Sequence, residues 1–168
     1  MYRLLYLVAL AAAGAFFLRS CLYEPVVIMS GSMEPTLPVG TKVIVNKWTY
    51  RFTPPQRGDI VSFPSPAGGK GLVKRVVAVA GEKVRLKHKQ VYINDQPLVE
   101  PYVKYTRPLE RLKGDDMVIG RVPEGFVVVM GDNRDESGDS RDWVGSITGE
   151  PVPFVSVESI EGKLMVKK

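Results

Sequence analysis

Cysteine and histidine are almost missing from this sequence of 168 residues, which has one of each. The single Cys21 excludes an internal disulfide and a zinc site built from several cysteines. The single His88 lies between two lysines, as is typical of a surface position rather than of a Ser-His-Asp triad. We therefore expect neither a metal nor a cofactor.

Several motifs of common enzyme classes are also missing. The sequence has no G-x-S-x-G elbow, no serine followed three residues later by lysine, and no phosphate-binding G-x-x-x-x-G-K-[ST] loop. There is no long basic run either, although the formal net charge is +5. The densest basic stretch, Lys83 to Lys89, alternates charged and apolar residues like a half-exposed strand. We therefore expect no nucleic acid partner.

The N-terminus is the one long apolar segment. Leu4 to Leu18 holds 15 uncharged residues, which as a helix would measure about 22 Å. Counted from Met1 to Tyr23 the helix would reach about 34 Å, enough for a bilayer core of roughly 30 Å. A membrane anchor over residues 1–23 and a cleaved secretory signal both fit these residues. Either one predicts that the rest of the chain is exported.

Helical periodicity is almost absent after this segment, and 13 prolines and 16 glycines punctuate short apolar runs. This pattern predicts a mostly β fold, a sandwich or barrel. Residues 24–82 and 121–168 are expected to form the core, with 83–120 as an inserted β subdomain. The predicted strands are Val26–Met29, Lys42–Asn46, Ile60–Phe63, Leu72–Ala80, Lys83–Leu86, Gln90–Ile93, Phe126–Met130 and Lys163–Val166.

The stretch "SGSMEPTL", Ser30 to Leu37, raises the question of a serine nucleophile. Without a suitable histidine its base would have to be a lysine, buried so that the amine can lose its proton. In "GLVKRVVAVAG" strand alternation places Lys74 on one face with Leu72, Val76 and Ala78. A strand apolar on both faces is usually buried, which favours a special role for this lysine. A lysine that protects a sheet edge is the alternative.

The acidic stretch Gly131 to Asp142, "GDNRDESGDSRD", invites a calcium-loop interpretation. That register places Val144 where a bidentate glutamate is required, and two arginines would repel the ion. A loop held by Asp–Arg hydrogen bonds is the interpretation that remains.

Four segments together carry a family resemblance: "SGSMEPTL", "RGDIVSF" (Arg57–Phe63), "KRVVAVAGE" (Lys74–Glu82) and "GDNRDESGDSRDW" (Gly131–Trp143). They resemble, in order, the four conserved boxes of type I signal peptidases, behind an N-terminal membrane anchor. The resemblance spans essentially the whole chain. One difference is the insertion "VGSITGE" between Trp143 and the following Pro-Val-Pro.

The resemblance implies a Ser-Lys protease in which Ser32 is the nucleophile and Lys74 its general base. It also implies an oxyanion site made of the Ser32 backbone N–H and the Ser30 hydroxyl. Ser137 corresponds to a residue that holds the lysine amine by a hydrogen bond.

The same resemblance assigns Asp139 and Arg141 to an ion pair that supports the site. Ile28, Met29 and Val73 correspond to residues that bind the substrate. The implied substrates are exported preproteins with small residues at the first and third positions before the cleaved bond.

The resemblance further implies an uncleaved single-pass anchor in the plasma (inner) membrane. The catalytic domain would then lie on the extracytoplasmic face in contact with lipid. We also expect a monomer, although no motif of the sequence bears on the oligomeric state. Two other classes share some of these features: a self-cleaving repressor-type protease, which would be cytosolic and carry a DNA-binding domain, and a non-catalytic membrane-tethered β module.

Overall fold

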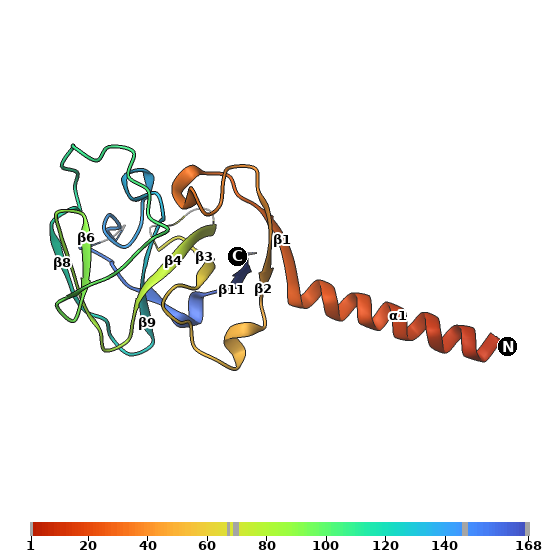
Figure 1. The fold of residues 1–168 in the computed structure, drawn as a ribbon. Helices are drawn as coiled ribbons and strands as arrows, with labels where there is room; N and C mark the ends of the chain where they lie inside the picture. Colours follow the sequence, from red (N-terminus) through yellow and green to blue (C-terminus); the bar gives the residue numbers. More distant parts are fainter. Residues whose placement is uncertain (1, 67, 69–70, 146–147, 167–168) are drawn as a thin grey trace.

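A long N-terminal helix precedes a mostly β body in the computed structural model (Figure 1). The structure describes residues 2–66, 68, 71–145 and 148–166. Helix α1, Tyr2–Leu22, extends away from the body, as Figure 1 shows. Over these described residues, no helix combines the length and the apolar character needed to cross a membrane. The helix expected at the N-terminus is present, and its role as an anchor stays a prediction.

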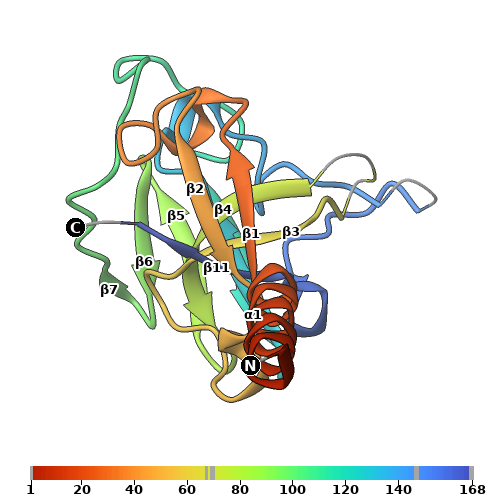
Figure 2. The ribbon, with the colours of Figure 1, turned by 90° about the vertical axis from the view of Figure 1, so that its right-hand side faces the viewer.

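The larger of two sheets is curled and antiparallel, with the strand order β1-β2-β11-β3-β4-β9-β10. Figure 2, which looks along α1, shows β1 continuing from the inner end of the helix beside β2. The sheet comprises β1 (Tyr23–Val27), β2 (Lys42–Asn46), β3 (Ile60–Pro64), β4 (Gly71–Val79), β9 (Phe126–Met130), β10 (Val155–Ser156) and β11 (Gly162–Met165).

The smaller sheet has the order β7-β6-β5-β8 and comes from the segment predicted as an insertion. Its strands are β5 (Lys83–Lys87), β6 (Gln90–Ile93), β7 (Gln96–Pro97) and β8 (Met117–Arg121). Four 3₁₀ turns complete the described elements: η1 (Gly31–Met33), η2 (Thr49–Arg51), η3 (Arg134–Glu136) and η4 (Val157–Ser159).

The mostly β prediction is confirmed, and three predicted strands, those now labelled β2, β6 and β9, have the predicted bounds. The predicted strand Val26–Met29 is wrong at both ends: β1 starts three residues earlier, directly after α1 and including Pro25, and it ends two residues earlier, at Val27. β1 lies at one edge of the sheet, and a proline such as Pro25, which has no backbone N–H, is tolerated on an edge strand. The short strands β7, β8 and β10 were not predicted, since none carries a long alternating pattern.

Three hydrophobic clusters hold the body together. The first lies where β4 and β9 pack on the small sheet, with Val77, Val91 and Met130 among its members. The second surrounds Phe63 and Trp143, whose rings meet edge to face 6.0 Å apart. The third packs the loop after β1 against β2 and β11, and it includes Met33 and Leu37 of the stretch that contains Ser32.

A β-bulge interrupts β4 and corrects the predicted faces of this strand. The register with β9 shifts between Val76 and Ala78. As a result Val77 and Ala78 both join the first cluster, while Val76 joins the second. Strict alternation had placed Ala78 on the face of Lys74. The bulge ends that face after Val76, because an extra residue reverses the alternation beyond it.

Candidate active site

Ser32 lies in the 3₁₀ turn η1, in the loop between β1 and β2. Met33 and Leu37, each 1% exposed, bury this loop in the third hydrophobic cluster. Ile28, before the turn, is buried in the same cluster. Because apolar residues on both sides anchor the turn, it has little freedom and the Ser32 side chain is held in one place. Ser32 itself is buried, at 7% exposure.

Lys74 approaches Ser32 from the middle of β4. A hydrogen bond of 2.7 Å joins Lys74 Nζ and Ser32 Oγ, 42 positions apart in the sequence. Lys74 is 3% exposed, and this burial lowers the pKa of its amine below the ordinary value. Asp139 opposes the shift by favouring the charged form. A buried amine with a lowered pKa, in contact with a hydroxyl, can accept the proton of that hydroxyl.

Ser30 lies on the open side of the same hydroxyl. Its Oγ is 3.3 Å from Ser32 Oγ, and the residue is exposed, with an extended backbone. A second hydroxyl beside Ser32 Oγ can donate a hydrogen bond to a group that reacts with the Ser32 hydroxyl.

Asp139 and Arg141 form the expected ion pair. The Arg141 Nε donates to Asp139 Oδ1 at 2.8 Å and its Nη2 donates to Oδ2 at 2.9 Å. Both side chains are buried, and the guanidinium keeps the pKa of Asp139 low although burial alone would raise it. Asp139 therefore stays ionised behind the site.

Ser137 makes a different contact from the one expected. Its hydroxyl donates to Asp139 Oδ2 at 2.8 Å, whereas the hydrogen bond recorded for the Lys74 amine is to Ser32. Ser137 nevertheless lies close to Ser32. A Cβ on Gly131 would fall 2.3 Å from Ser137 Oγ and 2.4 Å from the carbonyl oxygen of Ser32.

No role was predicted from the sequence for Gly131 or Asn133. They connect the acidic stretch Gly131 to Asp142, called the acidic loop below, to the η1 turn that contains Ser32. The Asn133 backbone N–H donates to Ser32 O at 3.1 Å, and its Nδ2 donates to Gly31 O at 3.2 Å. The two segments meet so closely at position 131 that there is no space for a side chain, and only glycine fits there. Their signal was the "GDN" triplet itself, since a glycine and an amide next to charged residues are typical of a loop with close backbone contacts.

Arg75, which follows Lys74 on β4, makes contacts that support the structure of the site. It donates to both carboxylate oxygens of Asp132, at 2.8 and 2.6 Å, and to the carbonyl of Gly58. Asp132 also accepts a hydrogen bond of 2.5 Å from Thr36. The Arg75–Asp132 pair therefore fastens the acidic loop to β4, and the hydrogen bond from Thr36 fastens it to the loop that contains Ser32.

The three predicted substrate-binding residues differ in their surroundings. Ile28 is buried in the third cluster, and Val73 packs against that same cluster. Met29 is 84% exposed and free of the core. The structure therefore places Ile28 and Val73 in the same cluster and leaves Met29, the residue after Ile28, at the surface.

The insertion after Trp143 closes on itself. Val144 and Pro151 form an isolated bridge, and Val152 N donates to Trp143 O at 2.9 Å. Ser146 and Ile147 lie outside the described residues. Because the chain leaves and returns at Trp143, the Asp139–Arg141 pair keeps its place.

Comparison with known proteins gives a consistent result. The family model described as "Signal peptidase, peptidase S26" matches residues 1–167. A probable signal peptidase I-1 from Synechocystis sp. is 39% identical over 149 residues, which cover 82% of this chain and 71% of the relative. Signal peptidase I U from Bacillus subtilis is 38% identical over 146 residues, covering 82% and 75%.

A solved structure agrees with these relatives. The crystal structure of a signal peptidase I from Enterococcus faecalis superposes with a TM-score of 0.54 at 33% identity, over 67% of this chain and 98% of that one. With a family model over nearly its whole length, this chain belongs to the signal peptidase I family of serine endopeptidases.

Proposed function

We propose that this protein is a membrane-attached endopeptidase that removes signal peptides with a Ser32–Lys74 dyad. The observation that carries the proposal is the 2.7 Å hydrogen bond between a buried lysine amine and a buried serine hydroxyl. A lysine whose pKa is lowered by burial supplies the base that the chain's single histidine does not, because His88 is exposed in the turn between β5 and β6.

In the first step Lys74, with its amine neutral, accepts the Ser32 proton as Ser32 Oγ attacks the carbonyl carbon of the cleaved bond. The tetrahedral intermediate places negative charge on the former carbonyl oxygen. The Ser30 hydroxyl and the Ser32 backbone N–H donate to that oxygen. The Lys74 ammonium then gives its proton to the leaving amine, and the signal peptide stays on Ser32 as an ester.

In the second step water takes the place of the leaving amine. Lys74 accepts a proton from the water, which attacks the ester carbonyl, and returns a proton to Ser32 Oγ as the signal peptide leaves. Neither step requires a metal or a cofactor. Asp139 and Arg141 support the site from behind, and Ser137 is proposed to fix the position of Asp139 through their hydrogen bond.

The substrate is proposed to be the extended end of a signal peptide in an exported preprotein. β1 ends the order of the large sheet, so an extended peptide can pair with its edge. Ile28 and Val73 share a cluster next to the nucleophile loop and are proposed to line the pockets, with Met29 at the entrance. Pockets bounded by packed apolar side chains leave room only for small residues at the first and third positions before the cleaved bond.

Attachment to the plasma membrane is supported by apolar surface on α1 and on the sheet beside it. Tyr2, Leu4 and Leu7 on the helix are 60–83% exposed. Ile44 and Met165 face each other in register on β2 and β11, and both are about half exposed. We propose a single-pass anchor with the catalytic body on the extracytoplasmic face, where exported preproteins arrive. A lipid surface is the partner that fits such residues.

The test is cleavage of a synthetic preprotein with alanine at both specificity positions, by the full chain in detergent micelles. Ser32→Ala is expected to lower kcat at least about 10⁴-fold, as loss of a covalent nucleophile does. Ser159→Ala is the control, because Ser159 lies in η4, after β10 at the opposite end of the strand order from β1, and its hydroxyl donates to Ser156 O at 2.7 Å. Activity retained in Ser32→Ala, or lost equally in Ser159→Ala, contradicts the proposal.

A further inference from the structure

One segment of the inserted region, Glu100 to Lys104, leaves the small sheet and pairs with the acidic loop of the site. Lys104 and Asn133 form an isolated parallel bridge. Lys104 N donates to Asp132 O at 2.8 Å, and Arg134 N donates to Lys104 O at 3.0 Å. The backbone that contacts Ser32 on one side is therefore held by this segment on the other.

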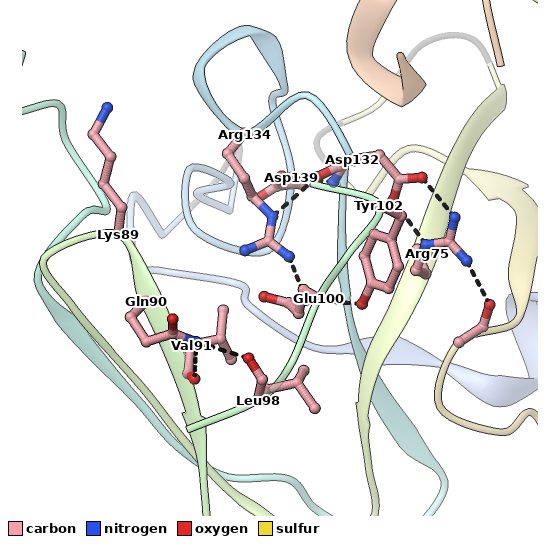
Figure 3. A network of polar contacts seen from close by, with 12 residues as sticks. Arg75, Lys89, Gln90, Val91, Leu98, Glu100, Tyr102, Asp132, Arg134 and Asp139 are labelled. Atoms are coloured by element: carbon pink, nitrogen blue, oxygen red, sulfur yellow. Dashed lines mark hydrogen bonds and ion pairs between the residues drawn. The ribbon is translucent and has the colours of Figure 1, made fainter. Parts of the chain in front are cut away.

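Glu100 is the buried centre of the contact. Its Oε1 accepts hydrogen bonds from Arg134 Nη2 at 2.5 Å and from the Tyr102 hydroxyl at 2.8 Å (Figure 3). The side chains of Glu100 and Arg134 are 6% and 2% exposed. Arg134 Nε in turn donates to Gly131 O at 3.1 Å. A buried carboxylate thus orients the arginine that holds the glycine against the nucleophile turn.

Tyr102 carries the second contact. Its ring lies 4.0 Å from the Arg75 guanidinium, between Arg75 and Glu100 in Figure 3. Arg75 is bonded to both oxygens of Asp132 and follows Lys74 on β4. The ring therefore covers the pair that fastens the acidic loop to the strand of the base. Burial and the neighbouring Glu100 raise the pKa of Tyr102, so it stays neutral across the pH range of an assay.

We propose that Glu100 and Tyr102 are positioning residues for the catalytic centre. They act through Arg134 and Arg75 and hold the Gly131–Arg134 turn at the spacing that aligns Ser32 with Lys74. The inference rests on the proposed dyad. Its physical reason is the close fit at Gly131, where there is no space for a methyl group between Ser32 O and Ser137 Oγ. A turn packed this closely transmits a small displacement directly to the nucleophile.

Tyr102→Leu tests the proposal, since it removes the ring from Arg75 and the hydroxyl from Glu100 without changing any charge. Tyr92→Leu is the matched control. The Tyr92 ring lies 4.1 Å from the guanidinium of Arg85, in the small sheet and outside this network. Tyr102→Phe keeps the ring and loses the hydroxyl. For each full-length variant in micelles, kcat, KM, thermal unfolding and the pH profile of kcat/KM are measured.

In Tyr102→Leu, kcat is expected to fall about 10- to 100-fold, as small misplacements of reacting groups do. KM is expected to change little, because β1 and the residues proposed to bind substrate are untouched. The acid limb of the kcat/KM pH profile is expected to move to higher pH. Loosening of the Gly131–Arg134 turn would admit water to Lys74, and because burial is the largest cause of the lowered pKa of Lys74, that pKa would rise. The charged groups that act on Lys74, Asp132, Asp139, Arg141 and Asp142, remain. Tyr102→Phe keeps the ring on Arg75 but loses the hydroxyl bonded to Glu100, so it is expected to lower kcat measurably but less than Tyr102→Leu, and Tyr92→Leu is expected to behave as wild type.

A merely structural role would lower the unfolding temperature and leave kcat and the acid limb unchanged, and this result overturns the proposal. So does an equal loss of kcat in Tyr92→Leu. If Tyr102→Leu shows no cooperative unfolding, Tyr102→Phe decides alone: a lowered kcat with a shifted acid limb supports the proposal, and wild-type values overturn it. Ser32→Ala in the same assay separates the two proposals. If Ser32→Ala is inactive and the Tyr102 variants have wild-type kcat and pH profiles, only the proposed positioning role is disproved.

Discussion

Lys74 occupies a position that disfavours its charged form. Burial lowers its pKa from the ordinary value of 10.5, and the nearby Arg141 adds to the effect, while Asp139 opposes it. Because the neutral amine is the proposed base, kcat/KM should rise with pH through the lowered pKa. Lys74→Arg should be inactive, although it keeps a positive charge, because a guanidinium does not lose its proton. A tenth of wild-type activity in Lys74→Arg would contradict the assignment.

The same residue predicts a pH-dependent stability difference, measured by denaturant unfolding of wild type and Lys74→Met. A lysine with a lowered folded-state pKa binds a proton more readily when unfolded, so it costs stability below its ordinary pKa. Lys74→Met should therefore be at least as stable as wild type at neutral pH. Its advantage should shrink as the pH rises from the lowered folded-state pKa towards 10.5, where the lysine of the unfolded chain also loses its proton. An advantage that grows with pH would mean that the folded protein favours the charged amine.

At the scale of elements, β11 depends on a glycine where it crosses between β2 and β3. Gly162 is buried, and a Cβ there would fall 2.5 Å from Asn46 O and 2.7 Å from Val45 Cγ1. Gly162→Ala should therefore push β11 off β2 and lower the free energy of unfolding by about 1–3 kcal/mol, the usual cost of overpacking. Chemical denaturation measures the change.

Gly71→Ala is the control for this prediction, because Gly71 is also a strand glycine. A Cβ on Gly71 would meet Phe63 O at 3.9 Å, an ordinary contact. This variant should be as stable as wild type or slightly more so, since alanine loses less conformational entropy on folding than glycine. Equal destabilisation of both variants would mean that backbone freedom, and not the close contact at Gly162, decides the result.

At the scale of the whole molecule, the body and α1 are expected to fold independently. None of the three hydrophobic clusters contains a described residue of α1. Leu22 O nevertheless accepts a hydrogen bond of 2.9 Å from Lys47 N, so the natural boundary falls before Leu22. A chain that starts at Leu22 should keep a cooperative unfolding transition close to that of the full chain in detergent. It should also cleave a signal-peptide substrate.

A chain that starts at Ile28 is the matched truncation. It also loses β1, which pairs with β2 over five residues, so its transition should occur at a lower temperature. Thermal unfolding followed by circular dichroism compares the two. If the chain starting at Leu22 has no cooperative transition, the helix is part of the folded core and the proposed independence of α1 is wrong.

The sequence by itself determined the β class, several strand bounds and the two residues of the proposed dyad. Alternation along β2, β6 and β9 is local, so their bounds follow from short stretches of sequence. Ser32 and Lys74 were found because they lie in family motifs, which are also local. The start of β1 was missed because a proline three residues after the end of a helix does not predict a strand.

Only the tertiary structure decided which distant groups meet. The contact of Lys74 with Ser32 joins residues 42 positions apart, and that of Arg134 with Glu100 joins residues 34 positions apart. Glu100 and Tyr102 have no local pattern that marks them, since their partners come from β4 and from the acidic loop. The bulge in β4 likewise arises from pairing with β9. Such contacts depend on how the sheets and loops pack against one another. Local patterns in the sequence do not reveal which distant segments come together.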